Sequence, residues 1–237
     1  MRQLKENLER LVLSAVSPWW LSLWRLKYLR QGALSLEDYL SIAFTFGLRS
    51  VRIKPLQIQS EALEFLRLLD EAQPKAILEI GTARGGMLYL FSRVASPRAL
   101  LISIDLPDGL FGGGYPASKS RLYRSFARHG QRIVLVRGDS HQAASLESIR
   151  SVLPRAGLDC LFIDGDHRYD GVKLDFEMYS PLVKPGGVIA FHDIVPGERS
   201  RVGGVPDFWK EVKSGSRHRE IVEDWAQPGF GIGVLWV

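Results

Sequence analysis

Apolar residues in this chain gather in short runs that alternate with stretches of helical periodicity. The runs predict five buried strands, over Ile77–Ile80, Ala99–Ile104, Ile133–Val136, Cys160–Ile163 and Val188–Phe191. Strands that alternate with helices indicate a parallel sheet covered on both faces. Two later runs, Glu220–Val222 and Gly231–Val237, would complete the sheet. The predicted fold class is α/β, a three-layer αβα sandwich around a mostly parallel sheet of roughly seven strands.

The stretch Ala76–Gly86 is the most informative local pattern. Its apolar run carries an acid at Glu79 and then breaks at Gly81, and after Gly85 and Gly86 a helical pattern resumes. This order predicts a strand, a glycine turn and a helix, as at the start of a βαβ unit. Glycine lets the backbone turn tightly and approach a ligand closely.

Residues 1–56 read as an N-terminal helical extension, and residues 57–237 as the main domain. Leu11–Trp24 is free of charged residues and contains Trp19, Trp20 and Trp24, but it is shorter than the roughly 20 apolar residues of a membrane span. Two interpretations stay open. The helix packs on the core or on a second subunit, as in a homo-oligomer, or its tryptophans make a peripheral membrane contact.

Two shorter signals mark helix starts near the junction of these regions. Ser35 and Asp38 resemble a capping box that opens a helix through Phe46. Ser60 is expected to cap the helix that precedes the first strand. Other helices are predicted over Ser118–His129, Gln142–Val152, Tyr169–Leu182 and Asp207–Lys213.

Composition narrows the function classes. The 237 residues are 46% hydrophobic and 24% charged with a net charge of +5, and no basic run with interleaved aromatics suggests a nucleic-acid partner. The single cysteine, Cys160, lies in an apolar run and is expected to be a buried thiol. A disulfide framework within the chain is therefore excluded. Acids at Glu6 and Glu9 argue against a signal peptide, so a cytoplasmic location is expected.

Acidic residues stand in or just after all five predicted strands: Glu79, Asp105, Asp139, Asp164 and Asp193. In an open parallel sheet, ligands bind at the carboxyl ends of the strands. These acids are therefore expected to line one cleft. The glycines do not follow the Gly-x-Gly-x-x-Gly pattern of dinucleotide sites. An acid beside the glycine turn suits a cationic or hydroxyl-bearing ligand better than a phosphate.

With its Glu-Ile-Gly-Thr-x-x-Gly-Gly motif, the chain from Gln57 to Val237 resembles the class I S-adenosylmethionine-dependent methyltransferases, which have a Rossmann-like fold. The resemblance implies S-adenosyl-L-methionine as cofactor. It implies that Glu79, Gly81 and Gly85 hold the methionine end, with Thr82 and Asp164 as further contacts. Asp105 would pair with the ribose hydroxyls, and Asp139 and Ser140 would lie near the adenine.

Three later motifs narrow the resemblance. They resemble motifs of enzymes of the macrocin O-methyltransferase and cephalosporin hydroxylase type. The three motifs are Phe162–Asp170, Lys184-Pro-Gly-Gly and Ala190–Asp193. Many such relatives use a divalent metal. The implied ligands are Asp164, Asp193 and His192, with Mg²⁺ or a softer metal bound. His192 could instead orient Asp193.

His167 is the candidate general base, since it lies three residues after Asp164, where catechol-type relatives place a lysine. An unperturbed imidazole pKa of about 6.5 suits proton removal near neutrality. The alternative is a surface histidine at a helix start.

These observations predict a metal-assisted O-methyltransferase that acts on a small-molecule hydroxyl of a sugar, a polyketide or another natural product. Two alternatives remain. A hydroxylase would need a further histidine near the metal. A non-catalytic ligand-binding or assembly subunit would use its tryptophan-bearing helix as the working surface.

Overall fold

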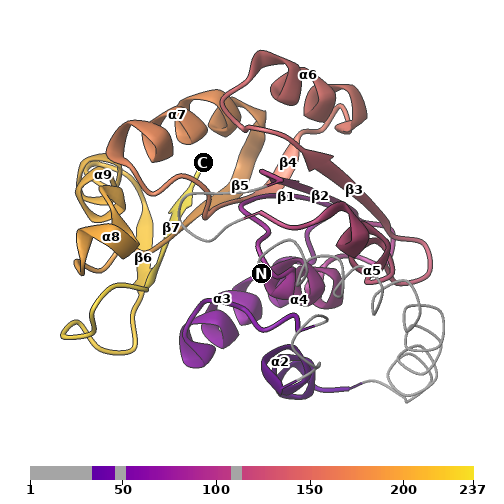
Figure 1. Cartoon of the computed structure of the whole chain (residues 1–237), viewed down its shortest axis with the longest axis horizontal. Coiled ribbons are helices and arrows are strands. Elements are labelled where there is room, and N and C mark those ends of the chain that lie inside the picture. Colours follow the sequence, from indigo (N-terminus) through magenta and orange to yellow (C-terminus); the bar gives the residue numbers. More distant parts are fainter. Residues whose placement is uncertain (1–33, 46–51, 108–113) are drawn as a thin grey trace, which may run out of the picture.

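The computed structural model describes residues 34–45, 52–107 and 114–237, and they build a seven-stranded sheet of order β3-β2-β1-β4-β5-β7-β6 (Figure 1). The first five strands are mutually parallel, whereas β7 runs antiparallel to both β5 and β6. The strands are β1 Ala76–Ile80, β2 Leu100–Asp105, β3 Arg132–Arg137, β4 Leu158–Ile163, β5 Val183–His192, β6 His218–Ile221 and β7 Ile232–Trp236. The α/β fold with a mostly parallel sheet is confirmed.

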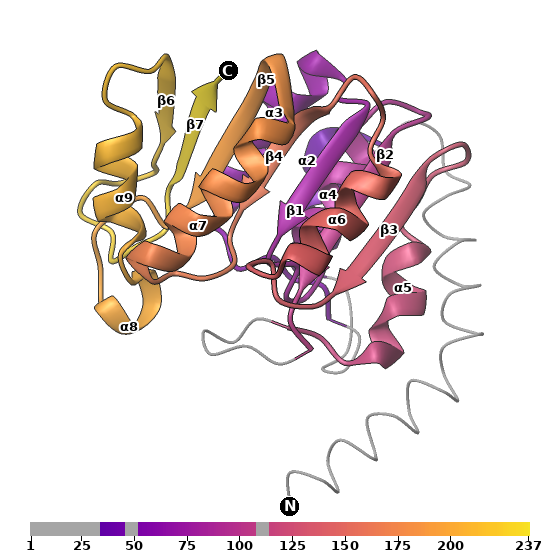
Figure 2. The same ribbon diagram turned by 90° about the horizontal axis from the view of Figure 1, so that it is seen from above.

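Helices cover both faces of the sheet (Figure 2). Those packed on one face are α2 Leu36–Thr45, α3 Gln59–Ala72, α4 Gly86–Val94 and α5 Ser120–Arg124. The opposite face carries α6 Ala143–Val152, α7 Tyr169–Tyr179 and α9 Val205–Val212. The remaining elements are α8 Arg199–Val202 and two 3₁₀ turns, Ala117–Lys119 and Ser180–Leu182. Each face has its own apolar core, because successive side chains of a strand point to opposite sides.

Three predicted elements differ from the structure. The helix expected over Ser118–His129 is a 3₁₀ turn followed by α5, which ends at Arg124. The strand expected from Val188 begins at Val183, and its first part pairs with the chain end, because Gly186 N donates to Val237 O at 2.8 Å and Val237 N donates to Gly187 O at 3.0 Å. The short helix α8 was not predicted, and α9 begins at Val205 rather than at Asp207.

The two predicted helix caps have different outcomes. Ser35 and Asp38 form the expected box, with Asp38 N donating to Ser35 Oγ at 3.1 Å and Ser35 N donating to Asp38 Oδ2 at 3.0 Å. The Ser60 cap is wrong. The helix begins at Gln59, with Ile58 at the N-cap position, so Ser60 lies within its first turn and its hydroxyl donates instead to Glu223 at 2.8 Å. Cys160 is a buried core residue, as expected.

The tryptophans Trp19, Trp20 and Trp24 and the helix predicted around them lie outside the described residues. Among the helices that the structure does describe, none is long and apolar enough to cross a membrane.

Glu61, a buried residue in the first turn of α3, holds the loop between β6 and β7. Its carboxylate accepts hydrogen bonds from Glu223 N at 3.1 Å, Gln227 Nε2 at 2.7 Å and Gly231 N at 2.9 Å. These hydrogen bonds hold the loop of residues 222–231, which contains Phe230, in place.

We expect Glu61→Ala to lower the free energy of unfolding by about 2–3 kcal/mol, because three donors lose a largely buried acceptor. The measurement is urea denaturation followed by circular dichroism. Glu64→Ala is the matched control, since Glu64 lies on the same helix and makes an exposed ion pair with Arg219. Such a pair contributes about 0–1 kcal/mol. Equal losses in the two variants would contradict the role given to Glu61.

Candidate active site

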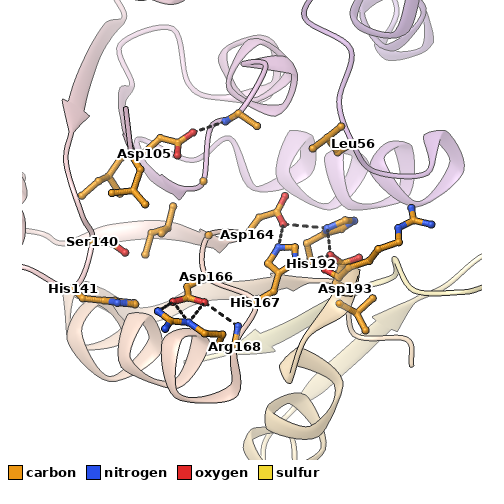
Figure 3. Close-up of a pocket in the computed structure, with 18 of the residues that line it drawn as sticks. Leu56, Asp105, Ser140, His141, Asp164, Asp166, His167, Arg168, His192 and Asp193 are labelled. Carbon is orange, nitrogen blue, oxygen red and sulfur yellow. Dashed lines mark hydrogen bonds and ion pairs between the residues drawn. The ribbon is translucent and has the colours of Figure 1, made fainter. Parts of the chain in front are cut away.

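A cavity of about 500 Å³ lies at the carboxyl ends of the parallel strands (Figure 3). It runs from Asp105 and Asp139 at one end to Asp164 and Asp193 at the other. Four of the five predicted acids therefore share one cleft. The fifth, Glu79, lines a smaller adjoining cavity of about 20 Å³. The parallel topology explains this convergence, since it places all these strand ends at one edge of the sheet.

Gly81 connects β1 to this cleft in a backbone conformation that favours glycine, with φ of +88°. A Cβ at this position would lie 1.9 Å from the carbonyl oxygen of Asp164. At Gly85, where φ is +78°, a Cβ would lie 2.6 Å from the Tyr123 ring. The sequence predicted the turn, but these glycines make room for neighbouring parts of the chain rather than only for a ligand.

Asp105 organises the glycine turn. Its Oδ2 accepts hydrogen bonds from Thr82 N at 3.0 Å and Ala83 N at 2.6 Å, and its Oδ1 accepts one from Gly114 N at 2.9 Å. Burial raises the pKa of Asp105, and these backbone donors oppose that shift. The Thr82 hydroxyl pairs with Ser103, so Thr82 contributes its backbone to the turn.

Glu79 is fully buried in β1, behind the glycine turn. Burial and the nearby charges of Asp105 and Asp164 raise its pKa well above the usual range, while a hydrogen bond with Thr82 opposes the shift. In the arrangement described here Glu79 therefore favours its neutral form. A cation beside it would favour the carboxylate.

The loop after β3 forms the other end of the cleft. Asp139 Oδ1 accepts from His141 N at 2.9 Å, and Ser140 O accepts from the Tyr179 hydroxyl at 2.7 Å. His141 lines the cavity, and its Nε2 lies 3.3 Å from Asp175 Oδ1. A hydrogen bond with the buried Asp175 raises the pKa of His141. Sequence reasoning passed over His141, because its partner stands on α7, far along the chain.

Two acids and two histidines meet at the opposite end of the cleft, after β4 and β5 (Figure 3). His167 Nε2 lies 3.4 Å from Asp164 Oδ1, and His167 Nδ1 lies 3.4 Å from Asp193 Oδ2. His192 Nδ1 lies 3.2 Å from Asp164 Oδ1 and 3.4 Å from Asp193 Oδ2. One ligand atom from each of Asp164, His167 and Asp193 falls within 4.8 Å of the others. Among the described residues His192 is not part of that group, and its Nε2 is buried without a hydrogen-bond partner.

The charges of this cluster balance within the protein. Burial opposes ionisation of His167, but Asp164 and Asp193 outweigh it and raise the pKa of His167 to about 9. Against the same opposition, the two carboxylates raise the pKa of His192 well above its usual value. Burial alone would raise the pKa of Asp164, but the His192 charge and hydrogen bonds from both histidines hold it well below its usual range. In this arrangement His167 is protonated at neutral pH, which does not suit a general base.

Phe230 forms a wall beside this cluster and was not predicted. Its backbone N donates to Asp193 Oδ1 at 2.9 Å, its ring lies edge-on to His192, and the Arg201 guanidinium lies 5.2 Å from its ring centre. Both Asp193 and Phe230 have left-handed backbones, with φ of +61° and +65°. Such strain in non-glycine residues is often found at functional sites. No short sequence pattern marks this position.

The strand order, the glycine turn and the acidic cleft define a Rossmann-like α/β domain with a ligand site at the carboxyl ends of its strands. A family model described as a methyltransferase domain matches residues 78–194. Over these residues the chain therefore carries a methyltransferase domain, of the class I S-adenosylmethionine-dependent type.

Two curated relatives and one solved structure illustrate the similarity. The chain is 36% identical over 131 residues to uncharacterized protein R132 of Acanthamoeba polyphaga mimivirus, a match that covers 55% of this chain and 57% of that protein. It is 28% identical over 152 residues to uncharacterized protein y4gI of Sinorhizobium fredii, covering 61% of this chain and 16% of the relative. The chain thus spans only part of the length of both relatives.

The fold is similar to that of the O-methyltransferase from Bacillus cereus in complex with SAH. The TM-score is 0.57 and the identity 20%, and the match covers 90% of this chain and 96% of that one. At this identity the similarity concerns the fold.

Proposed function

We propose that this chain is an O-methyltransferase that uses S-adenosylmethionine and a divalent metal to methylate a hydroxyl group of a sugar, a polyketide or another natural product. The observation that carries the proposal is the convergence of Asp164, His167 and Asp193 at one end of a cleft whose other end holds Asp105. A methyltransferase must bind the methyl donor and the methyl acceptor side by side. This cleft offers a separate set of polar groups for each of the two molecules. The Bacillus cereus neighbour, an O-methyltransferase, supports oxygen as the acceptor atom.

The main cavity supports binding of S-adenosylmethionine. Its volume of about 500 Å³ is typical of a small-molecule site. Asp105 would accept a ribose hydroxyl, the Asp139–Ser140 loop would border the adenine, and the turn at Gly81 would border the methionine end. The cofactor supplies a methyl group already activated by its sulfonium charge. The task of the protein is then to align the acceptor oxygen with it.

Asp164, His167 and Asp193 are the residues that would hold the metal. Two carboxylates and one imidazole with convergent donor atoms fit a divalent ion, and the imidazole favours a somewhat softer ion such as Mn²⁺ over strict Mg²⁺ ligation. A metal bound here would lower the pKa of a nearby hydroxyl group. His192 would orient both carboxylates through Nδ1. A metal bound here would displace a proton from His167, whose Nδ1 could then donate to Arg201 O, so His167 would serve as a ligand rather than as the predicted general base.

The sequence disfavours the hydroxylase alternative, because a hydroxylase needs a second histidine near the metal and no sequence motif indicates one. The structure does place two histidines at this point, since His167 and His192 both contact Asp164. However, the ligand atoms that converge come from two carboxylates and one imidazole, which is not the two-histidine, one-carboxylate set. The methyltransferase therefore stays the better supported function. The assembly-subunit alternative rests on the tryptophan-bearing helix, outside the described residues.

Isothermal titration of S-adenosylhomocysteine into the purified chain, with and without Mn²⁺, tests the proposal. We expect one binding site per chain, and we expect methyl transfer in a panel of hydroxylated sugars and polyketides to depend on the metal. Asp105→Leu should weaken binding by about tenfold or more, since it removes an acceptor for the ribose. Absence of binding by the wild-type chain at millimolar ligand would overturn the proposed function.

A further inference from the structure

Gln57, just before α3, is a buried residue with one satisfied and one unsatisfied end. It is 6% exposed, and its Nε2 donates a hydrogen bond to Asp164 Oδ2 at 2.7 Å. Because a carboxylate oxygen only accepts, this contact fixes which end of the amide faces Asp164. The other end, Oε1, is buried and has no hydrogen-bond partner among the described residues. Gln57 also lies outside residues 78–194, which the family model matches.

A second buried acceptor shares the same small cavity. Glu79 is 1% exposed, and its Oε2 likewise lacks a hydrogen-bond partner within the described part of the chain. Gln57 and Glu79 both line the cavity of about 20 Å³ between the start of α3 and the glycine turn. Buried oxygen atoms without a donor are rare in folded proteins. Two of them around one small cavity indicate that a donor group belongs there.

The small cavity adjoins the main one, because Leu56, Gly81, Ala83 and Asp164 line both. A volume of about 20 Å³ holds one group the size of a water molecule. Glu79 and Asp164 both line this cavity, and a positive charge placed there would favour the ionised form of Glu79, which a neutral donor would not do. A primary ammonium group is compact, is positively charged and carries three hydrogen-bond donors. It therefore matches the small volume of the cavity, its acidic lining and its two unpaired acceptors.

We infer that Gln57 is a ligand-binding residue, whose Oε1 together with Glu79 Oε2 receives a primary ammonium group of the molecule in the main cavity. The inference rests on the proposed function, in which that molecule is S-adenosylmethionine and the group is its α-ammonium. Two cations also line the small cavity, namely Lys54, whose Nζ lies 5.7 Å from the Phe44 ring centre, and the exposed Arg84. They would suit a carboxylate, so a test must separate the amine from the carboxylate.

Titration of three ligands into the wild-type chain and Gln57→Met tests the inference. S-adenosylhomocysteine carries the amine and the carboxylate, S-adenosyl-3-thiopropylamine carries the amine alone, and 5′-methylthioadenosine carries neither. Methionine is close in shape to glutamine but can neither donate to Asp164 nor accept from an ammonium. We expect Gln57→Met to lower the affinity for the first two ligands by about tenfold or more, because hydrogen bonds to charged groups are strong. The affinity for 5′-methylthioadenosine should change by less than about twofold.

Gln59→Met is the matched control, because Gln59 is exposed and lies two residues away at the start of α3. It should leave all three affinities unchanged. Equal weakening of all three ligands by Gln57→Met would overturn the inference and indicate a structural role only. Unchanged binding of the amine ligand would overturn it as well, and would indicate that a water molecule fills the small cavity. Failure of S-adenosylhomocysteine to bind the wild-type chain would instead overturn the proposed function and this inference together.

Discussion

Replacement of Gly81 by alanine is expected to lower the free energy of unfolding by about 3–5 kcal/mol. The left-handed backbone accounts for about 1–2 kcal/mol, and overpacking against a backbone atom for about 2–3 kcal/mol, the upper part of the usual range. The added Cβ would lie 1.9 Å from the carbonyl oxygen of Asp164. Neither segment moves freely, because Gly81 N donates to Ile104 O at 2.9 Å and Asp164 N donates to Ile80 O at 2.8 Å. Urea denaturation followed by circular dichroism measures the loss.

Gly186→Ala separates the two causes. Gly186 has a similar φ of +80°, but a Cβ there would lie more than 4 Å from every atom in the described part of the chain, apart from its direct neighbours. This control should lose only the conformational part, about 1–2 kcal/mol. If both variants lost the same amount, the close approach of the Asp164 backbone would not be the reason for a glycine at position 81. If Gly81→Ala did not fold at all while Gly186→Ala did, the larger cost at Gly81 would stand.

The fold could be predicted from the sequence because its signals are local. Each buried strand reads as one apolar run, and parallel pairing then places the strand ends at one edge. This is why Asp105, Asp139, Asp164 and Asp193 were expected in one cleft, where they lie. Where local signals compete, the prediction failed. Ser60 resembles a helix cap, yet its hydroxyl donates to Glu223, which is 163 residues away.

The detailed site could not be read from the sequence, because its contacts join distant segments. Gln57 contacts Asp164 across 107 residues, and Phe230 contacts Asp193 across 37. Neither residue type marks a site by itself. The role of His167 depended on its surroundings in the same way. Its spacing from Asp164 suggested a base, but only the fold shows that it lies between two carboxylates, which raise its pKa to about 9.

Asp164→Asn is expected to reduce methyl transfer by about 10²–10⁴-fold, with an acceptor that supports turnover. The Asp164 carboxylate accepts hydrogen bonds from both histidines of the cluster and from Gln57, and it supplies one of the convergent ligand atoms. Asparagine keeps the shape but removes the negative charge that a metal needs. We therefore also expect Mn²⁺ affinity to fall by about tenfold or more. Formation of S-adenosylhomocysteine measures the rate, and electron paramagnetic resonance of free Mn²⁺ measures the affinity.

Asp170→Asn is the matched control, because Asp170 is an exposed acid in the first turn of α7, six residues from Asp164 and outside the lining of the cleft. Its charge interacts with the helix dipole, so its loss should cost a few tenths of a kcal/mol in stability. Methyl transfer and Mn²⁺ affinity should both stay near the wild-type values. If Asp164→Asn kept both values as well, the acids of this cluster would serve only to hold the two histidines. The acceptor would then have to bind elsewhere along the cleft.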